Sequence, residues 1–378
     1  MTEITHDDLV QYLERSDWRH GEPGVFGSLW AVHGRDPVGI SSSLDSDSPD
    51  WELTLVRLAA AWGRDLDTIR RDLLLLHQDE IEFAAPGDGT GISLKAGAAL
   101  FAMARRAVRA AAATASKPKP VISNNYGVEG DRVARQAVFG HTRVGSYAVP
   151  VRYPLDRLLT DQAKDAFEGM EDVEKYGEPV QRRASRTLMQ SLDFLIQEII
   201  QPARDPSPQV LVAGVEAGVS RELVTAVREV FEGNDDLPFV AMKASWAVLS
   251  HAPRVASVVS IEHEAAGLLE VTSKKLGEMK PLEYEVVSGK IAGVEPVDPS
   301  VDRAAGVPST VQVMTRRNGR LCRVRVSVSA EQWHDVGAWL DSGEVVVSHG
   351  QIRSSANTLV LEDASPLRPI GQVILPGA

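Results

Sequence analysis

The spacing of apolar residues in the middle of the chain predicts one long buried helix. A stripe of five apolar residues from Ala184 to Ile199 advances in steps of four, four, three and four. This spacing keeps their side chains on one face of a helix, which must then pack against other parts of the protein. Proline is favoured at the first helical position, so we expect the helix to begin at Pro179. The side chains expected in the core are Leu188, Leu192, Leu195, Ile196 and Ile199.

Residues before position 120 alternate between helical and extended patterns. Thr5 stands where an N-cap is expected, and Asp65 and Asp67 stand at the start of a further helix. An alanine-rich run after Ser93 has the composition with the highest helix propensity. The helices expected here are 5–16, 51–62, 66–76 and 93–115, the extended segments are 27–32, 38–43 and 80–84, and a loop follows at 122–131.

Strands and helices follow one another in an irregular order between 132 and 280. The strand at 142–153 contains Pro150, which confines it to a sheet edge or a bulge because proline lacks the amide hydrogen of the ladder. A helix at about 209–232 breaks at Gly218 and restarts at Ser220 as a new N-cap. The remaining elements are a solvated acidic loop at 156–178, strands at 239–246 and 254–261, and a helix at 263–278.

The pattern after residue 281 predicts a small β-barrel. Asn318-Gly319 separates two extended runs, and this dipeptide is the strongest short signal for a β-hairpin. Ser288-Gly289 indicates a bulge, and Ser329 caps a helix. The order of three strands, one helix and two strands is that of an OB-fold. The strands are 283–294, 310–316, 321–328, 344–352 and 358–362, and the helix is 330–340.

These elements predict an α+β multidomain protein. We expect an N-terminal α+β domain at 1–120, a middle α+β domain at 132–280 and an OB-like five-stranded barrel at 281–372. The boundary near residue 120 follows Ser116-Lys-Pro-Lys-Pro120, where proline ends the alanine-rich helix.

Composition narrows the class of protein without identifying an activity. The 378 residues include 43% apolar and 24% charged residues, which is ordinary for a globular chain. A single cysteine excludes a disulfide framework and a thiolate zinc site. The chain has no apolar run of membrane-spanning length, and its first ten residues are acidic where a signal peptide is basic. We therefore expect a soluble, cytoplasmic protein.

Divided at residues 120 and 280, the chain of net charge −12 is acidic in each of its three parts. Basic and acidic residues number 13 and 18 up to residue 120, 18 and 23 from 121 to 280, and 9 and 11 thereafter. No segment has the basic excess that is typical of a protein whose affinity comes from phosphates, although a local patch remains compatible with these numbers.

Three segments together resemble an uncharacterised family of soluble proteins from actinobacteria and other bacteria. They are YLERSDWRHGEPGVFGSLWAV at 12–32, FGHTRVGSYAVPVRYPL at 139–155, and the predicted barrel from Gly289 to Leu367, which ends in LEDASPL. The resemblance spans nearly the whole chain. It supports the three-part layout and implies no catalytic residues.

The motifs that usually carry chemistry are incomplete in this sequence. A zinc-protease helix starting at His263-Glu264 needs a second histidine where Gly267 stands. A phosphate-binding loop at Gly289-Lys290 needs Ser or Thr where Ile291 stands. Cys322 lies in the middle of a predicted strand, where a buried structural role is typical. We expect no cofactor and no metal, while a catalytic site assembled from distant residues stays open.

Five arginines on the predicted barrel hairpin are the candidate partner-binding residues. Strand alternation turns Val324 and Val326 toward the core, so Arg323 and Arg325 point outward. Such a surface could hold an acidic protein or a phosphate backbone, or it could be a solvated strand face. The candidates are Arg316, Arg317, Arg320, Arg323 and Arg325.

The leading hypothesis is a non-enzymatic scaffold, adaptor or sensor in a bacterial protein assembly. Its partners would be other proteins or copies of the same chain, and a role in a multi-gene system such as anti-phage defence is compatible with it. One alternative is nucleic-acid binding through the arginine hairpin, which the net charge and the scarcity of stacking aromatics disfavour. Another is a hydrolase with a dispersed site in the middle domain.

Limited proteolysis tests the predicted layout. We expect the first cuts near 116–131, within 156–178 or near 295–309, because proline, glycine and acidic residues gather there. Mass spectrometry of the fragments locates the cuts, and resistance of all three segments would contradict the boundaries.

Overall fold

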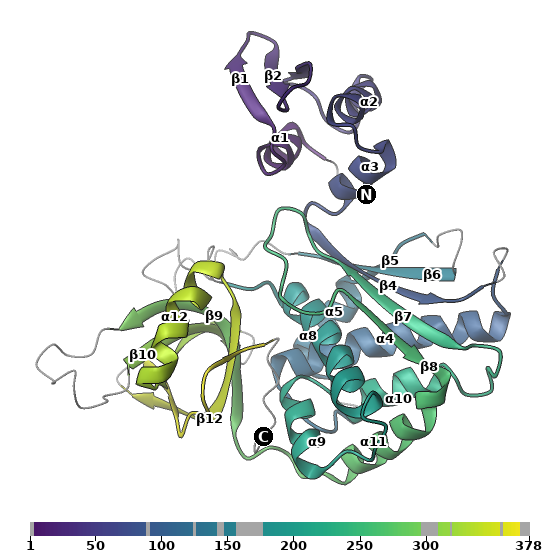
Figure 1. The fold of residues 1–378 in the computed structure, drawn as a ribbon, viewed down its shortest axis with the longest axis vertical. Helices are drawn as coiled ribbons and strands as arrows, with labels where there is room; N and C mark the ends of the chain where they lie inside the picture. Colours follow the sequence, from purple (N-terminus) through teal and green to yellow (C-terminus); the bar gives the residue numbers. More distant parts are fainter. Residues whose placement is uncertain are drawn as a thin grey trace, which may run out of the picture. The chain divides into compact units, whose positions relative to one another are not determined.

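The computed structural model describes residues 4–87, 91–123, 126–141, 147–155, 177–295, 309–317, 320–355 and 358–370. Within them the protein has a mixed α+β architecture of ten α-helices and three sheets (Figure 1). The chain divides into two compact units. The first comprises Met1–Glu80 and Ser245–Ala252, and the second comprises Ile81–Ala244 and Pro253–Ala378. The three expected domain ranges stay predictions.

The first unit packs three helices against a small antiparallel sheet. Thr5 accepts a hydrogen bond from the Asp8 amide, and the Asp8 side chain accepts one from the Thr5 amide, so the predicted N-cap forms a complete capping box. Its elements are α1 (His6–Glu14), β1 (Arg19–Pro23), β2 (Gly27–Ala31), β3 (Val38–Ser41), α2 (Trp51–Trp62) and α3 (Leu66–Leu74), with sheet order β1-β2-β3. Strand β1 was not predicted, because its sequence RHGEP is polar throughout and shows no alternation.

A five-stranded sheet and a layer of helices follow. Figure 1 shows α4, α8, α10 and α11 on one side of this sheet. The strands are β4 (Gln78–Ala85), β5 (Val138–Phe139), β6 (Tyr147–Pro154), β7 (Phe239–Ser245) and β8 (Val258–Glu262), in the order β5-β6-β4-β7-β8. The helices are α4 (Leu94–Ser116), α5 (Gly127–Gln136), α8 (Val180–Phe194), α9 (Pro208–Glu216), α10 (Arg221–Glu229) and α11 (Ala266–Glu278). A π-helical turn (Leu195–Ile200) continues α8, and a 3-10 turn (His263–Ala265) precedes α11.

Helix α8 is the central element of the second unit. Four residues of the predicted stripe are buried (Leu188, Leu192, Leu195 and Ile199), and Ile196 is partly buried. Every residue from 180 to 189 is buried as well, including those on the polar faces of the helix. The prediction of a core helix is therefore confirmed, but residues 180–189 of α8 are enclosed on all sides rather than on one.

The break between α9 and α10 is also confirmed. Gly218 has a φ of 98°, and a Cβ atom there would lie 2.4 Å from the Thr187 side chain of α8. Only glycine fits a position that combines a left-handed backbone with this close approach. Ser220 then accepts a hydrogen bond from the Leu223 amide and starts α10.

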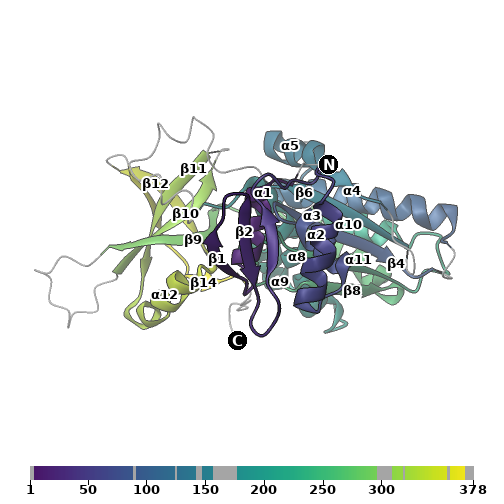
Figure 2. The ribbon, with the colours of Figure 1, turned by 90° about the horizontal axis from the view of Figure 1, so that it is seen from above.

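The C-terminal sheet closes partly into a ring. The antiparallel pairs β9–β10, β10–β11, β9–β12 and β12–β13 are joined by a parallel pair, β11–β13. Figure 2 shows α12 at one end of these strands, where Val336 is buried in the sheet's apolar core. The elements are β9 (Glu285–Glu295), β10 (Ser309–Arg317), β11 (Arg320–Val328), α12 (Ala330–Ser342), β12 (Val345–Ser355), β13 (Thr358–Glu362) and β14 (Arg368–Pro369).

Three local predictions need correction. The loop expected at 122–131 is in part helix α5, which starts at Gly127. The bulge in β9 falls at Ala292, where the register with β10 shifts, and not at Ser288-Gly289. Pro150 lies in the second strand of its sheet, beside the two-residue edge strand β5, and the amide of Gly140, which follows β5, donates to the Pro150 carbonyl. Residues 142–146, 156–176, 296–308 and the turn Asn318-Gly319 lie outside the described residues.

Shortening the core side chains of α8 should destabilise the protein. Leu192 and Leu195 are fully buried, so replacing either with alanine removes apolar burial and leaves a cavity. We expect each change to lower the free energy of unfolding by about 2–5 kcal/mol in chemical denaturation. Leu94→Ala is the matched control, because Leu94 is almost completely exposed and its loss should leave that free energy nearly unchanged.

Candidate functional site

The β10–β11 hairpin places three of the five candidate arginines on one face of the sheet. In the register, Arg316 pairs with Leu321, Arg323 lies opposite Met314, and Arg325 lies opposite Gln312. These side chains point away from the apolar core, which holds the alternate residues of the strands as predicted. However, Met314 on the same face is buried, so part of the face is covered by other elements of the protein.

Two hairpin arginines are held by carboxylates of the same sheet. The guanidinium of Arg317 makes a bidentate pair with Glu285, with donor–acceptor distances of 2.9 and 2.8 Å. This hydrogen bonding lowers the pKa of the Glu285 carboxyl, against the opposing effect of burial. Arg325 donates from Nε to Oε1 of Glu295 over 2.7 Å. Both pairs are partly exposed, so a competing anion would have to displace a carboxylate that is already in place.

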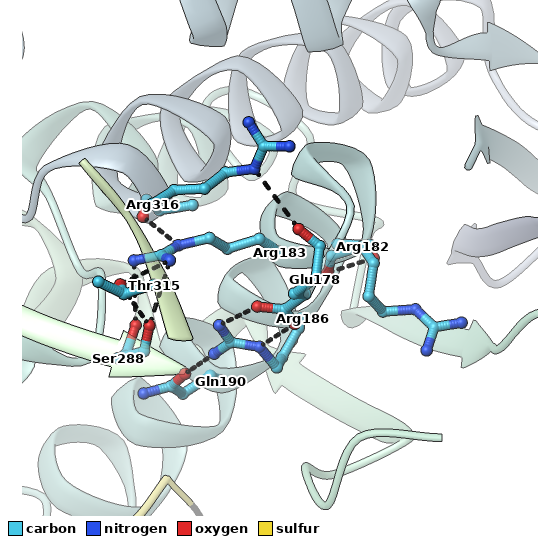
Figure 3. Close-up of polar contacts among 10 residues, drawn as sticks. Glu178, Arg182, Arg183, Arg186, Gln190, Ser288, Thr315 and Arg316 are labelled. Carbon is cyan, nitrogen blue, oxygen red and sulfur yellow. Dashed lines mark hydrogen bonds and ion pairs between the residues drawn. The ribbon is translucent and has the colours of Figure 1, made fainter. Parts of the chain in front are cut away.

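Arg316 does not face solvent, which corrects the expectation that it lies on an exposed strand face. Its side chain is 15% exposed and points toward the start of α8 (Figure 3). Its Nε lies 3.5 Å from the Glu178 carbonyl oxygen, and its Nη1 lies 3.9 Å from Oε1 of Glu129. Arg323 is half-buried, and Arg320 is exposed at the start of β11. Strand parity correctly assigns the face but cannot show that a helix covers it.

The covering element carries a buried arginine cluster, formed by Arg182, Arg183 and Arg186 of α8 (Figure 3). Arg186 donates from Nε and Nη2 to the two carboxylate oxygens of Glu178, over 2.8 and 3.0 Å. A third hydrogen bond runs from its Nη1 to Oε1 of Gln190 over 3.1 Å. Arg186 is 2% exposed, so this bidentate pair lies in the interior of the protein.

Arg183 connects α8 with α4 and the C-terminal sheet. Its Nε donates to the Ala115 carbonyl in the last turn of α4 over 2.7 Å, where a positive charge also interacts favourably with the helix dipole. On β9, Nη1 donates to the Ser288 carbonyl over 3.2 Å and Nη2 to the Ser288 hydroxyl over 3.1 Å. On β10, Nη1 reaches the Thr315 hydroxyl over 3.2 Å. One guanidinium thus joins three elements.

Burial and the charges of neighbouring side chains shift the pKa values of this region in opposite directions. Burial lowers the pKa of Arg183 to about 10, even though the negative charge of Glu178 acts in the other direction. Burial alone would raise the pKa of the Glu178 carboxyl, but the charge and hydrogen bonds of Arg186 outweigh it, and the pKa is lowered. Lys290 of β9 has a lowered pKa because of burial, which the charge of Glu178 partly offsets. Glu178 is therefore the buried anion on which several cations depend.

A second ionic cluster joins α9 to the C-terminal sheet. Glu216, at the end of α9, accepts hydrogen bonds from the Tyr284 hydroxyl over 2.6 Å and from Nη2 of Arg368 over 3.0 Å. His349 Nδ1 lies 3.1 Å from the same carboxylate, and its ring stacks on that of Tyr284 with centroids 4.5 Å apart. Burial raises the pKa of Glu216, but the hydrogen bonds from His349 and Tyr284 outweigh it and lower the pKa.

These ionic and hydrogen-bonded contacts are suited to holding elements together within the second unit.

Burial raises the pKa of the Cys322 thiol, which favours the unreactive protonated form. Within the described residues, no group of three or more His, Cys, Asp or Glu side chains could hold a metal ion. None of the helices in the described part of the chain is both long and apolar enough to cross a membrane.

Sequence reasoning missed the buried arginine cluster for a physical reason. The segment VQRRASR at 180–186 has the polarity of an exposed helical face. Its burial depends on the C-terminal sheet, whose Ser288 and Thr315 are more than 100 residues away in the sequence. No local signal in the sequence contains that information.

No protein-family model, no curated protein and no solved structure matches this chain. The site must therefore be interpreted from its own geometry.

Replacing Glu178 with glutamine should strongly destabilise the protein. Glu178→Gln keeps the side-chain shape but leaves the guanidinium of Arg186 buried without its counter-charge. We expect a loss of about 3–5 kcal/mol in the free energy of unfolding, measured by chemical denaturation. The matched control is Glu285→Gln, which removes the partly exposed pair with Arg317 and should cost less than about 1 kcal/mol. Equal effects of the two changes would contradict the buried pairing.

The Glu216 cluster should make stability depend on pH. Its lowered pKa means that the ionised carboxyl stabilises the folded state above about pH 4.3, the ordinary value for glutamate. This contribution is lost as the pH falls through the folded-state pKa, which lies below that value. We expect the difference in unfolding free energy between wild type and Glu216→Gln to shrink as the pH falls from 5 to 3. A difference that stays constant down to pH 3 would contradict the assignment.

Proposed function

We propose that this chain is a non-enzymatic scaffold, adaptor or sensor that acts in the cytoplasm within a bacterial protein assembly. The observation that carries the proposal is an apolar hairpin tip in the first unit, formed by Val25 and Phe26 between β1 and β2. These side chains are 90% and 84% exposed, and Leu29 on β2 is exposed as well. Large apolar side chains grouped in this way are typical of protein-binding surfaces.

The charge of the first unit indicates what kind of protein would bind there. Met1–Glu80 contains 16 acidic and 7 basic residues, a net charge of −9, and Ser245–Ala252 adds no Asp, Glu, Lys or Arg. Most of the charge of −12 therefore lies in this unit. A partner with an apolar pocket surrounded by basic residues would be complementary to the tip in both shape and charge. The same charge distribution opposes nucleic-acid binding by this unit.

We also propose that the C-terminal sheet is an OB-like barrel of five strands. The ring of pairings passes through β9, β10, β11, β13 and β12, and α12 lies between the third and fourth strands of the chain order. These features support the assignment, since OB-folds combine a five-stranded, partly open barrel with Greek-key connections. In this proposal the barrel is attached to the helices through Arg183 and Glu216.

Nucleic-acid binding through the arginine hairpin remains the alternative that is less well supported. Arg317 and Arg325 are paired with carboxylates, and Arg316 is turned toward α8. A phosphate backbone would have to compete with these contacts. No arrangement among the described residues favours the hydrolase alternative over the other two.

Partner capture tests the proposed function. A tagged chain produced at native abundance in its host should co-purify with a stoichiometric protein, and the double variant Val25→Ser/Phe26→Ser should lose it. Leu94→Ser is the control, since Leu94 is equally exposed but belongs to the second unit. All three proteins should unfold at the same temperature, because exposed substitutions rarely alter stability.

The identity of the captured protein shows whether the partner is another protein or a second copy of this chain. If light scattering shows that the wild type forms an oligomer and the tip variant does not, the tip would be assigned to homo-oligomer formation. Salt-sensitive binding of an oligonucleotide, lost when Arg317 and Arg325 become serine, would instead promote the nucleic-acid alternative. Capture of the same stoichiometric partner by the tip variant and the control would contradict the role of Val25 and Phe26.

A further inference from the structure

The second unit contains a pocket whose lining residues belong to neither of the two ionic clusters described above. It has a volume of about 380 Å³ and lies between α4, α5 and the paired strands β5 and β6. This volume is within the range of about 300–1,000 Å³ that small-molecule sites occupy. The lining combines arginines with apolar side chains: Arg105, Val108, Arg109, Asp131, Ala134, Arg135, Ala137, Phe139 and Val151.

The charged side chains of the pocket leave a positive excess. Arg109 is already engaged, because its Nε donates to Oδ1 of Asp131 over 2.9 Å and its guanidinium stacks on the Tyr126 ring, 3.9 Å from the centroid. The Nε of Arg135 donates to the Asp131 backbone carbonyl, and its terminal nitrogens form no ion pair with any described residue. Within the described part of the chain, Arg105 forms no ion pair. Two guanidiniums are therefore free to meet an anion at the pocket.

The rest of the lining is apolar and includes an exposed aromatic ring. Phe139 on the edge strand β5 is 44% exposed, and its inner side packs edge-to-face on Phe101 of α4, with centroids 5.1 Å apart. Val108 and Val151 form the buried floor. A planar apolar group placed against Phe139 and this floor would cover surface that now faces water.

We propose that this pocket binds a small organic anion that carries an aromatic ring, with the ring against Phe139 and the anionic group between Arg105 and Arg135. Arginine provides paired donors that match carboxylate, sulfonate and phosphate oxygens. The volume accommodates a ligand of about the size of a mononucleotide. The inference does not rest on the hairpin tip of the first unit, and it adds a small-molecule ligand to a protein for which only protein partners are proposed above.

The recessed shape favours a small molecule over a nucleic acid. A backbone-tracking groove needs a run of cations along an open surface together with several stacking aromatics. Here Asp131 adds a carboxylate to the lining, and Phe139 is its one aromatic side chain among the described residues. A small anion needs only Arg105 and Arg135, whereas a phosphate chain needs a longer row of cations and is repelled by the Asp131 carboxylate.

Equilibrium binding of two aromatic anions tests the proposal. The probes are 1-anilinonaphthalene-8-sulfonate, followed by fluorescence, and adenosine monophosphate, followed by calorimetry, with adenosine as the uncharged reference. At least one anion should bind the full-length protein with a Kd below about 1 mM, and adenosine should bind at least about tenfold more weakly than its monophosphate if the nucleotide is bound. Raising the salt concentration should weaken binding of the anions.

Matched variants locate the binding site. Arg105→Ser/Arg135→Ser should raise the Kd by about tenfold or more, because it removes the contacts with the anionic group. Phe139→Ala should also raise the Kd, because it removes the contact with the aromatic ring of the ligand. The control is Arg132→Ser, which removes an exposed arginine of α5 that does not line the pocket. Its Kd should stay within about twofold of the wild-type value.

Two results would overturn the proposal. One is that neither anion binds below 1 mM. The other is that binding is equally strong in the Arg105→Ser/Arg135→Ser variant and in the Arg132→Ser control. Thermal unfolding of each variant shows whether it is folded, so loss of binding through misfolding is recognised. Partner capture by Val25 and Phe26 is measured separately, and neither result predicts the other.

Discussion

The burial of positive charge on α8 constrains the second unit more than any other feature. A guanidinium removed from water without partners would cost several kcal/mol, and α8 buries three of them within five residues. Glu178 supplies the counter-charge for Arg186, and backbone carbonyls and hydroxyls supply the acceptors for Arg183. These acceptors come from α4, β9 and β10, so the elements must stay at hydrogen-bonding distance from α8. The attachment of the C-terminal sheet follows from this requirement.

The backbone of β9 is adapted to the same requirement. A Cβ atom at Gly289 would lie 1.8 Å from the Met314 carbonyl oxygen, so only glycine permits β9 to approach β10 this closely. The neighbouring residue, Ser288, offers both its carbonyl and its hydroxyl to Arg183. Gly289, which suggested a bulge in the sequence, therefore allows β9 and β10 to make close contact beside the buried Arg183. The irregularity of the register lies three residues further on, at Ala292.

Local features of the fold could be predicted because their causes are local. Thr5, Ser220 and Ser329 cap helices where the sequence indicated, since capping involves residues only three positions apart. The strands on either side of Asn318-Gly319 were predicted for the same reason. Helix α5 was missed because its glycines and charged residues have the composition of a loop, and its burial at Val133 comes from packing on α4. The partners of Arg316 could not be predicted either, since Glu129 of α5 and Glu178, just before α8, lie far away in the sequence.

The arginines of this protein differ in function according to what lies opposite each guanidinium. Arg183 and Arg186 are saturated by buried acceptors and hold the fold together. Arg317 and Arg325 are neutralised at the surface by carboxylates of their own sheet. A run of arginines in the sequence is therefore weak support for a binding site, because intramolecular partners can satisfy it completely. Arg105 and Arg135 of the α4–α5 pocket are different, since neither pairs with a carboxylate among the described residues and the pocket also contains an exposed aromatic ring. By this criterion, the pocket is better supported as a ligand site than the hairpin, although the arginines are more concentrated on the hairpin and the sequence around the pocket contains no recognised motif.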